Sequence, residues 1–287
     1  NDSCMFRDLF SIKKRKEEEM NGFVKMTGIS AVLAAAGVLC GAESIAPQTL
    51  SDWAGVNQNV TQDAEGVITM KPKSTTISSK KAITVDPAKT YKLSGKFRKV
   101  PGSTVDTRIY FGLASCDEKG NPIPSGAVIV MPNTDTVLAD AVKKGDKVIK
   151  VKDASKWDKR NFKIVAFNTK ADLSDLPNRT FSSNITKLEQ KGDVWEITLQ
   201  APMRTAYPAG TAVRQQSHGS TYMYPGAAYV SAPADWKEFT AEIKGQVKSG
   251  SPSKQWWPGA RKGKIVIFSV WNKPTEMQFK DISLTEK

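Results

Sequence analysis

The sequence predicts an all-β protein, built as an antiparallel sandwich or barrel. From about residue 50 onward, much of the chain alternates apolar and polar residues with a period of two, which is the pattern of half-buried strands. Gly, Pro, Asn and Asp fall between the alternating segments, as turn residues do between neighbouring strands. Residues 50–132 and 218–287 contain no clear amphipathic helix. Many short strands joined by turns are typical of sandwiches and barrels.

The expected strands form two groups that flank a different middle region. The first group precedes residue 133 and comprises GVITMKP, TTISSKKAITV, KTYKLSGKFRKV and TRIYFGLASCD. The second group follows residue 217 and comprises STYMYPGAAYV, WKEFTAEIKGQV, GKIVIFSVWN and MQFKDISLTEK. We interpret residues 43–132 and 218–287 as two parts of one sandwich, because a loop of a sandwich tolerates a long insertion at modest entropic cost.

Residues 133–217 are predicted to be the inserted part, a small β-rich and barrel-like subdomain. Within it, the apolar spacing of Val137, Leu138, Ala141 and Val142 predicts a short helix-like piece over residues 134–144. The segments KVIKVKD, FKIVAFNT and YPAGTAVRQQ predict strands. ITKLEQKGDVWEITL predicts a hairpin that turns at residues 191–193.

Residues 1–42 are predicted to be an N-terminal extension followed by a secretory signal peptide. Lys25 precedes an uncharged stretch over residues 26–42 that ends in small residues, which is the order of a cleavable signal. Cleavage is expected after Ala42; a lipid-modified Cys40 and a helix buried in the fold are the alternatives. Export predicts a secreted, extracytoplasmic bacterial protein with no transmembrane segment after cleavage. Cys116 would then be the one remaining cysteine of three, which excludes an internal disulfide.

The formal net charge of the chain, +13, indicates which classes of binding partner it favours. Lysines are spread along the chain, and no arginine-rich tract, zinc-ligand set or helix-turn-helix pattern accompanies them. A basic balance alone gives only non-specific attraction to polyanions. We therefore predict that nucleic acid is not the partner, whereas the same field favours an acidic polysaccharide or a cell envelope.

Three segments carry a family resemblance: TYKLSGKFRK (90–99), DWKEFTAEIKG (235–245) and GKIVIFSVWNKPTEMQFKDISLTE (263–286). They resemble the secreted jelly-roll modules of the carbohydrate-binding type, the galactose-binding-like sandwiches attached to glycoside hydrolases. The resemblance covers roughly residues 50–132 and 218–287 and implies a jelly-roll β-sandwich. It implies no required cofactor, but such modules often hold a structural calcium ion, for which Asp52 and Asp281 match in residue type.

The insert departs from this family. It is similar in style to small barrels found in secreted and phage-associated surface proteins, and typical jelly-roll modules have no insert of this size. A sugar-binding groove carries over to this chain only if the insert leaves the concave face of the sandwich open.

No catalytic residue is predicted. His218 is the single histidine, no nucleophile elbow stands near it, and the histidine and cysteine count is too low for a zinc site. A glycosidase needs two carboxylates, for which the candidates are Asp106, Asp117, Glu118, Asp172 and Asp175. Such pairs arise by chance in a chain with many acidic residues. We interpret DLSDLPNR as a turn in which Asp and Ser bind backbone donors ahead of Pro177.

Aromatic residues are the candidate ligand-binding groups. The C–H face of a pyranose ring stacks on an indole or phenol ring, while polar neighbours bind the sugar hydroxyls. Tyr222 and Tyr224 share parity, so one sheet face would carry both, and Tyr229 follows them. Arg108, in DTRIYFG, would supply the polar contact.

Tryptophans divide into candidate contacts and candidate core. Trp256 and Trp257 stand in a polar loop beside Gln255 and Arg261, and because adjacent strand positions face opposite ways, one of the two rings is expected at the surface. The remaining tryptophans are assigned to the interior: Trp236 and Trp271 to the core, and Trp53, Trp157 and Trp195 to strand starts or the core of the insert.

Three functions remain open. The first is a secreted, non-catalytic carbohydrate-binding protein that recognises a polysaccharide or glycan by aromatic stacking and polar contacts. The second is a structural or adhesion protein of a cell surface that uses the same fold without binding sugar. The third is a polysaccharide-active enzyme.

Overall fold

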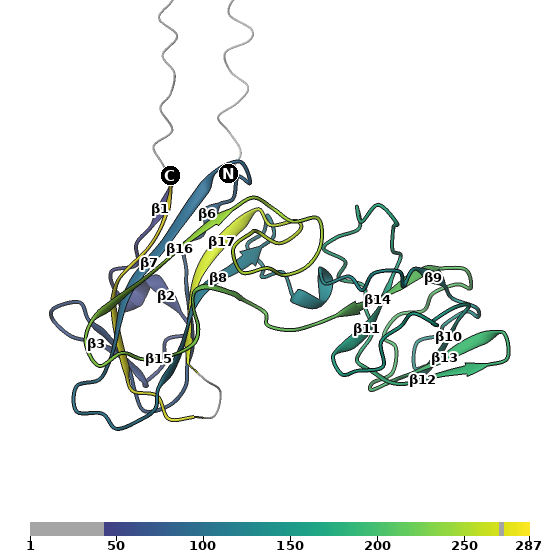
Figure 1. The fold of residues 1–287 in the computed structure, drawn as a ribbon, viewed down its shortest axis with the longest axis horizontal. Coiled ribbons are helices and arrows are strands. Elements are labelled where there is room, and N and C mark those ends of the chain that lie inside the picture. The colour runs from purple at the N-terminus through teal and green to yellow at the C-terminus, as the bar shows by residue number, and fades with distance from the viewer. Residues whose placement is uncertain (1–42, 270–272) are drawn as a thin grey trace, which may run out of the picture. The chain divides into compact units, whose positions relative to one another are not determined.

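The computed structural model describes residues 43–269 and 273–287, and it is all-β with antiparallel strand pairs (Figure 1). Its helical content is two 3-10 turns, η1 (Leu50–Asp52) and η2 (Ser125–Ala127). The described part of the chain holds no helix long and apolar enough to span a membrane. The expected signal peptide and Trp271 lie outside the described residues.

Two sheets form the sandwich. Sheet A has the order β16 (Lys237–Lys244), β7 (Thr90–Lys99), β18 (Met277–Glu286), β4 (Ile68–Met70) and β3 (Val60–Gln62), with β1 (Ser44–Ile45) also paired to β18. Sheet B has the order β15 (Met223–Ser231), β8 (Arg108–Cys116), β17 (Lys262–Ser269), β5 (Thr76–Ser79) and β2 (Trp53–Ala54), with β6 (Ile83–Thr84) paired to β17.

The connections make the sandwich a jelly roll. From β4 to β8 and again from β15 to β18, the chain passes from one sheet to the other, so that β4, β18, β7 and β16 lie side by side in sheet A. The strands β5, β17, β8 and β15 occupy the matching positions in sheet B. This interleaving of sequence-distant strands is the arrangement of two Greek keys in a jelly roll.

The inner faces of both sheets supply one hydrophobic core. Leu93 and Phe97 of β7 face Ile109 and Phe111 of β8, and the rings of Phe97 and Phe111 lie 4.9 Å apart. Because side chains alternate across a strand, Lys92, Ser94 and Lys96 of β7 point outward, as does Tyr110 of β8. The alternation that predicts the strands therefore also decides which residues reach the two outer faces.

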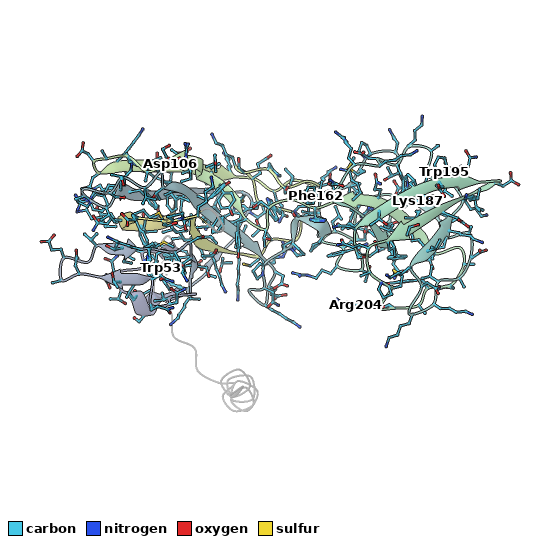
Figure 2. The ribbon with its side chains drawn as sticks, turned by 90° about the horizontal axis from the view of Figure 1, so that it is seen from below. Trp53, Asp106, Phe162, Lys187, Trp195 and Arg204 are labelled. Carbon is cyan, nitrogen blue, oxygen red and sulfur yellow. The ribbon has the colours of Figure 1, made fainter. Side chains whose placement is uncertain are left out.

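Residues between β8 and β15 form a second group of strands with its own core. One three-stranded sheet has the order β10 (Val148–Val151), β13 (Val194–Leu199) and β12 (Ile185–Lys191); the other has the order β11 (Lys163–Phe167), β14 (Ala212–Ser217) and β9 (Thr136–Val137). Figure 2 shows Trp195 and Lys187 on the β12–β13 hairpin. Phe167 and Tyr207 stack at 4.2 Å inside the cluster.

The barrel-like insert is an open arrangement of sheets, and the helix expected within it is absent from the described residues. The six strands form two three-stranded sheets, and isolated bridges from Leu138 to Val151 and from Phe181 to Ala166 connect these segments without closing a barrel in the described residues. Residues 134–144 form no helix: Leu138 N–H donates to Thr211, and Val142 pairs with Tyr207. Leu138 and Val142 are both buried, as their spacing suggests, but their backbone hydrogen bonds go to distant strands instead of along a helix.

Candidate functional site

The outer face of sheet B carries a cluster of aromatic rings, which we call the aromatic face: Tyr110, Tyr222, Tyr224, Tyr229 and Phe268. Tyr110 lies between Ile109 and Phe111, which enter the core, so its ring points outward. Phe268 is its pairing partner on β17, with ring centroids 5.5 Å apart and planes 24° apart. Tyr110 also lies 4.6 Å from Tyr224 and 6.1 Å from Tyr229.

A bulge in β15 places Tyr224 on this face. Met223 pairs with Leu113 and Ala227 with Phe111, so residues 224–226 stand opposite Gly112 alone. A Cβ at position 112 would lie 2.7 Å from the Cα of Tyr224. The missing side chain of Gly112 therefore lets β15 cross close above β8 and lets Tyr224 reach Tyr110.

A second irregularity exposes Tyr229. The pairing register shifts between Ala228 and Val230, and Tyr229 between them has a φ of 58°. Its side chain is 48% exposed, and the Arg108 guanidinium carbon lies 5.2 Å from the ring centroid. Arg108 also forms an ion pair with Asp106 at 3.2 Å. A bulky residue in the left-handed region is strained, and such strain is often found at functional positions.

Basic residues flank the rings. Lys262 and Lys264 alternate with the core residues Gly263 and Ile265 of β17, so they share the outer face with Phe268. Beside the lysines on the same face lies a small buried apolar cluster, formed by Ala114, Cys116 and Val266 and partly covered by Tyr222. Arg108 thus stands at one end of the aromatic face and the two lysines at the other.

Of the residues predicted from the sequence, the structure brings Tyr222, Tyr224 and Arg108 to this face, together with Tyr229. Tyr110 and Phe268 were missed. The signal for Tyr110 was available, because it shares parity with Arg108 in the same strand. Phe268 could not be assigned without knowing that β17 pairs with β8.

Trp256 and Trp257 do not form a surface patch, and the expectation that one of their rings stays outside is wrong. Their side chains are 0% and 1% exposed. Trp256 packs edge-on against Tyr91 at 5.5 Å, and Trp257 Nε1 donates to Pro252 O at 3.0 Å. The pair closes the end of the sandwich core, because the loop turns both rings inward.

Gln255 and Arg261 are exposed, and the N–H of Arg261 donates to Cys116 O at 2.8 Å, in the apolar cluster that Tyr222 partly covers. Arg261 immediately precedes β17, seven residues before Phe268. At about 3.3 Å per residue this separates them by roughly 23 Å along the strand. A ligand centred on Tyr110 and Phe268 would have to be several sugar units long to reach Arg261, whereas Tyr222 lies at the same end of sheet B as Arg261.

Trp236 is not a core residue, contrary to expectation. It is half-buried on the outer face of sheet A, with the Arg98 guanidinium carbon 4.4 Å and Lys280 Nζ 4.8 Å from its ring centroid. Lys237 pairs with Phe97, which points into the core, so the preceding tryptophan falls beside outward-facing Arg98. Trp53 and Trp157 are buried as expected, and Trp195 packs partly buried against the core of the insert.

The candidate carboxylates serve structural contacts. Asp172 Oδ1 accepts from Ser174 N at 3.0 Å and Asp175 Oδ1 from Lys170 N at 3.1 Å, so the predicted turn is confirmed. Asp175 also pairs with Arg214, a side chain that is fully buried. Asp106 and Asp117 pair with Arg108 and Arg179 respectively, and Glu118 is exposed.

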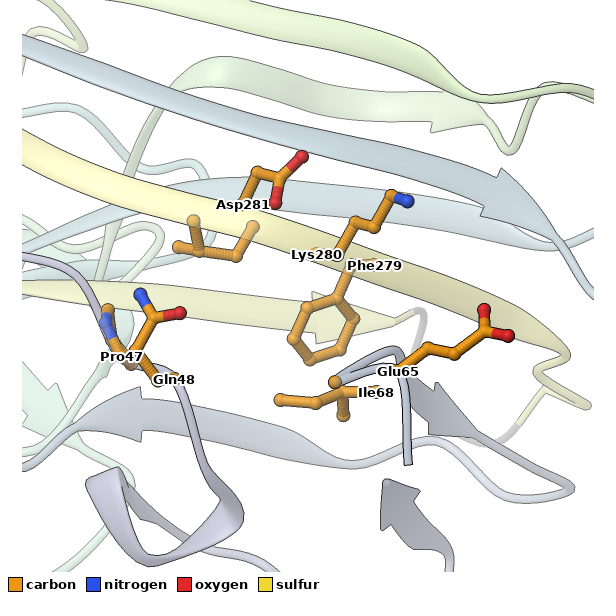
Figure 3. Close-up of a pocket in the computed structure, with 9 residues that line it drawn as sticks. Pro47, Gln48, Glu65, Ile68, Phe279, Lys280 and Asp281 are labelled. Atoms are coloured by element: carbon orange, nitrogen blue, oxygen red, sulfur yellow. The ribbon is translucent and has the colours of Figure 1, made fainter. Parts of the chain in front are cut away.

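Asp52 and Asp281 also have other partners. Asp52 Oδ2 accepts from Gln48 N and Thr49 N, both at 2.9 Å, and these bonds lower its pKa. Asp281 pairs with Lys96 at 3.0 Å and borders a pocket of about 140 Å³ in which Phe279 and Ile68 lie between Glu65 and Gln48 (Figure 3). Across the described residues, no group of three or more His, Cys, Asp or Glu side chains is placed to hold a metal ion.

Contacts between the insert and the sandwich gather near Cys116. Arg179 donates to Asp117 and to Pro122 O, both at 3.1 Å, and Asn178 N donates to Ala127 O at 2.8 Å. Along β8, Cys116 is six residues from Tyr110, or roughly 20 Å at about 3.3 Å per residue. The insert is therefore held at the end of β8 opposite to Tyr110.

Comparison of this chain with protein-family models, with curated proteins and with solved structures found no match.

Proposed function

We propose that this protein binds a glycan on the aromatic face and does not transform it. The observation that carries the proposal is the ring cluster around Tyr110, which lies within 6.1 Å of Tyr224, Tyr229 and Phe268 on the side of sheet B away from the core. Aromatic rings clustered at a surface are unfavourable to hydrate, and they can stack on the C–H faces of sugars.

Charge favours an acidic glycan. Arg108 and the two lysines of β17 flank the rings, and the whole chain carries +13. Arg forms paired hydrogen bonds with carboxylates and sulfates, and a positive field raises the rate of encounter with a polyanion. The jelly-roll order supports this proposal through its resemblance to carbohydrate-binding modules, although the fold by itself assigns no function.

Affinity electrophoresis through gels that contain acidic or neutral polysaccharides tests the proposal. The wild-type chain is expected to be retarded by an acidic polysaccharide at physiological salt. Tyr224→Ala should weaken binding about tenfold, which corresponds to about 1.4 kcal/mol, because it removes the ring closest to Tyr110. Tyr224→Phe keeps that ring and should bind nearly as well.

Val148→Ala is the matched control, because Val148 is an exposed apolar residue of the insert on β10. Equal retardation of the wild type and of Tyr224→Ala would contradict the proposal, since charge alone would then explain the binding. Failure to bind any glycan, together with self-association in solution, would instead favour an adhesion protein.

A further inference from the structure

A second pocket, with a volume of about 360 Å³, lies beside His218, the only histidine of the sequence. Its wall comes from residues 124–126, which lead from β8 into the insert, and from residues 218–221, which lead back to β15. Residues of the insert complete it, mainly the segment 181–184. This volume is within the range of small-ligand sites.

Neutral polar groups on this wall form a connected set. His218 Nε2 lies 2.6 Å from Asn184 Oδ1, and Asn184 Nδ2 donates to Gln200 Oε1 at 3.1 Å. Because Oδ1 can only accept, Nε2 is the donor, and Nδ1 of the neutral ring is left as an acceptor. Burial lowers the pKa of His218, so the ring is neutral at pH 7.

Two exposed phenylalanines lie beside this pocket. Phe181 borders the pocket with 37% of its surface exposed. Phe162, labelled in Figure 2, is 59% exposed, and its ring lies edge-on to His218 with 5.3 Å between the ring centroids. Phe162 also has a φ of 67°, a strained conformation for a bulky residue. A strained and exposed aromatic residue is costly in the free protein, which suggests that its role is to contact something else.

Charge limits what the pocket can hold. In the described part of the chain, the residues that line it include no carboxylate, ammonium or guanidinium group. The nearby ammonium of Lys163 donates to Ser217 Oγ at 3.1 Å and pairs with Asp158 at 3.5 Å. A charged ligand would lose its hydration without gaining a counter-charge, whereas an uncharged ligand rich in hydroxyls would find donors and acceptors.

We propose that this pocket binds one uncharged sugar residue, with Phe181 against its C–H face and Asn184, Gln200 and His218 on its hydroxyls. The choice of a sugar among uncharged polyhydroxyl ligands rests on the proposed glycan binding. Thr221 of the pocket directly precedes Tyr222 of the aromatic face, so the two sites adjoin in the chain. The pocket is neutral where the aromatic face is basic, and the two are expected to prefer different sugars.

The single histidine provides the test, because its imidazole Cε1–H gives one resolved NMR resonance that reports on this pocket. Neutral monosaccharides, namely hexoses, pentoses and N-acetylhexosamines, are titrated into the full chain, with uronic acids as charged probes. A neutral sugar is expected to shift the His218 resonance saturably in the millimolar range, and uronic acids should bind more weakly. Phe181→Ala and Gln200→Ala should each raise Kd at least several-fold.

Phe181→Tyr keeps the ring and serves as the conservative variant, Val148→Ala is the control for exposed apolar surface, and Tyr224→Ala should leave the His218 titration unchanged. The absence of a saturable shift with every neutral sugar, or an unaltered Kd in Phe181→Ala, would overturn the assignment. The two proposals can fail separately. If an acidic polysaccharide retards the protein in a Tyr224-dependent way but no sugar shifts the His218 resonance, glycan binding on the aromatic face is supported and sugar binding in the pocket is refuted.

Discussion

The indole of Trp256 lies directly on the backbone of Gly263, where an added Cβ would come 2.5 Å from Cη2 of the ring. Gly263 is in β17 and pairs with Ser115 of β8, so the ring covers the end of sheet B from the inside. The loop that carries the tryptophan pair is therefore part of the core.

Replacing Trp256 by alanine is expected to lower the free energy of unfolding by about 3–5 kcal/mol, because it empties a fully buried site. Gly263→Ala should also destabilise, since the ring must move away from the new methyl group. Urea denaturation measures both. Trp236→Ala is the matched control, and its half-exposed ring should cost only about 1 kcal/mol through lost contacts with Arg98 and Lys280. Equal losses in the two tryptophan variants would contradict the assignment of Trp256 to the core.

Gly112→Ala should weaken glycan binding although residue 112 itself is not expected to contact the glycan. A Cβ at this position collides with the backbone at Met223 and Tyr224, so β15 must lift and carry the Tyr224 ring away from Tyr110. Retardation in the polysaccharide gel is expected to fall about as far as in Tyr224→Ala. Val148→Ala, an exposed substitution on β10 of the insert, is the control. Wild-type affinity in a folded Gly112→Ala would show that the position of Tyr224 does not matter.

Asp175→Ala should destabilise the protein by about 3–5 kcal/mol. Arg214 is 0% exposed and Asp175 7%, with 2.5 Å between Nη2 and Oδ2, so the substitution leaves a buried guanidinium without its counter-charge. Asp172→Ala, in the same turn, removes an exposed carboxylate that accepts from Ser174 N and should cost much less stability. The difference between the free energies of unfolding of the two variants, measured by urea denaturation, gives the contribution of the buried ion pair. Similar losses in the two variants would indicate that the ion pair contributes little to stability.

Cys116 is expected to resist alkylation in the folded protein. Burial raises the pKa of its thiol from 9.0 to about 11, so the reactive thiolate at pH 8 is about 100-fold scarcer than in the unfolded chain. Labelling with iodoacetamide, with Cys4 and Cys40 replaced by serine, should therefore be slow in buffer and fast in urea. Rapid labelling of the native protein would show that sheet B opens at this end.

The same thiol makes stability depend on alkaline pH. A raised pKa means that the folded state favours the protonated thiol, so its contribution is complete below pH 9 and is lost as the pH rises through about 11. Burial also raises the pKa of Tyr91 and Tyr207, which act in the same direction above pH 10. The denaturation midpoint is expected to fall over this range, and Cys116→Ala should reduce the slope between pH 9 and 11.

The sequence of a segment was sufficient to predict those strands and turns whose geometry depends on residues of the same segment. The alternation in TYKLSGKFRK predicts β7 because every second residue there enters the core. The turn between β12 and β13 follows from Gly192, which adopts a φ of 60°. The turn before Pro177 follows from Asp side chains that bind backbone N–H groups a few residues away.

The sequence by itself therefore determined the all-β class, most strands, and three members of the aromatic face, Tyr222, Tyr224 and Tyr229, together with the neighbouring Arg108. Tertiary structure alone decided that both indoles of the tryptophan pair are buried and that Tyr110 and Phe268 meet. The physical reason is that alternation gives the face of a side chain within its own strand, whereas burial and clustering depend on which distant strand lies beside it. Gly263 makes room for Trp256 and Gly112 for Tyr224, and neither relationship is written in the segment that carries the aromatic residue.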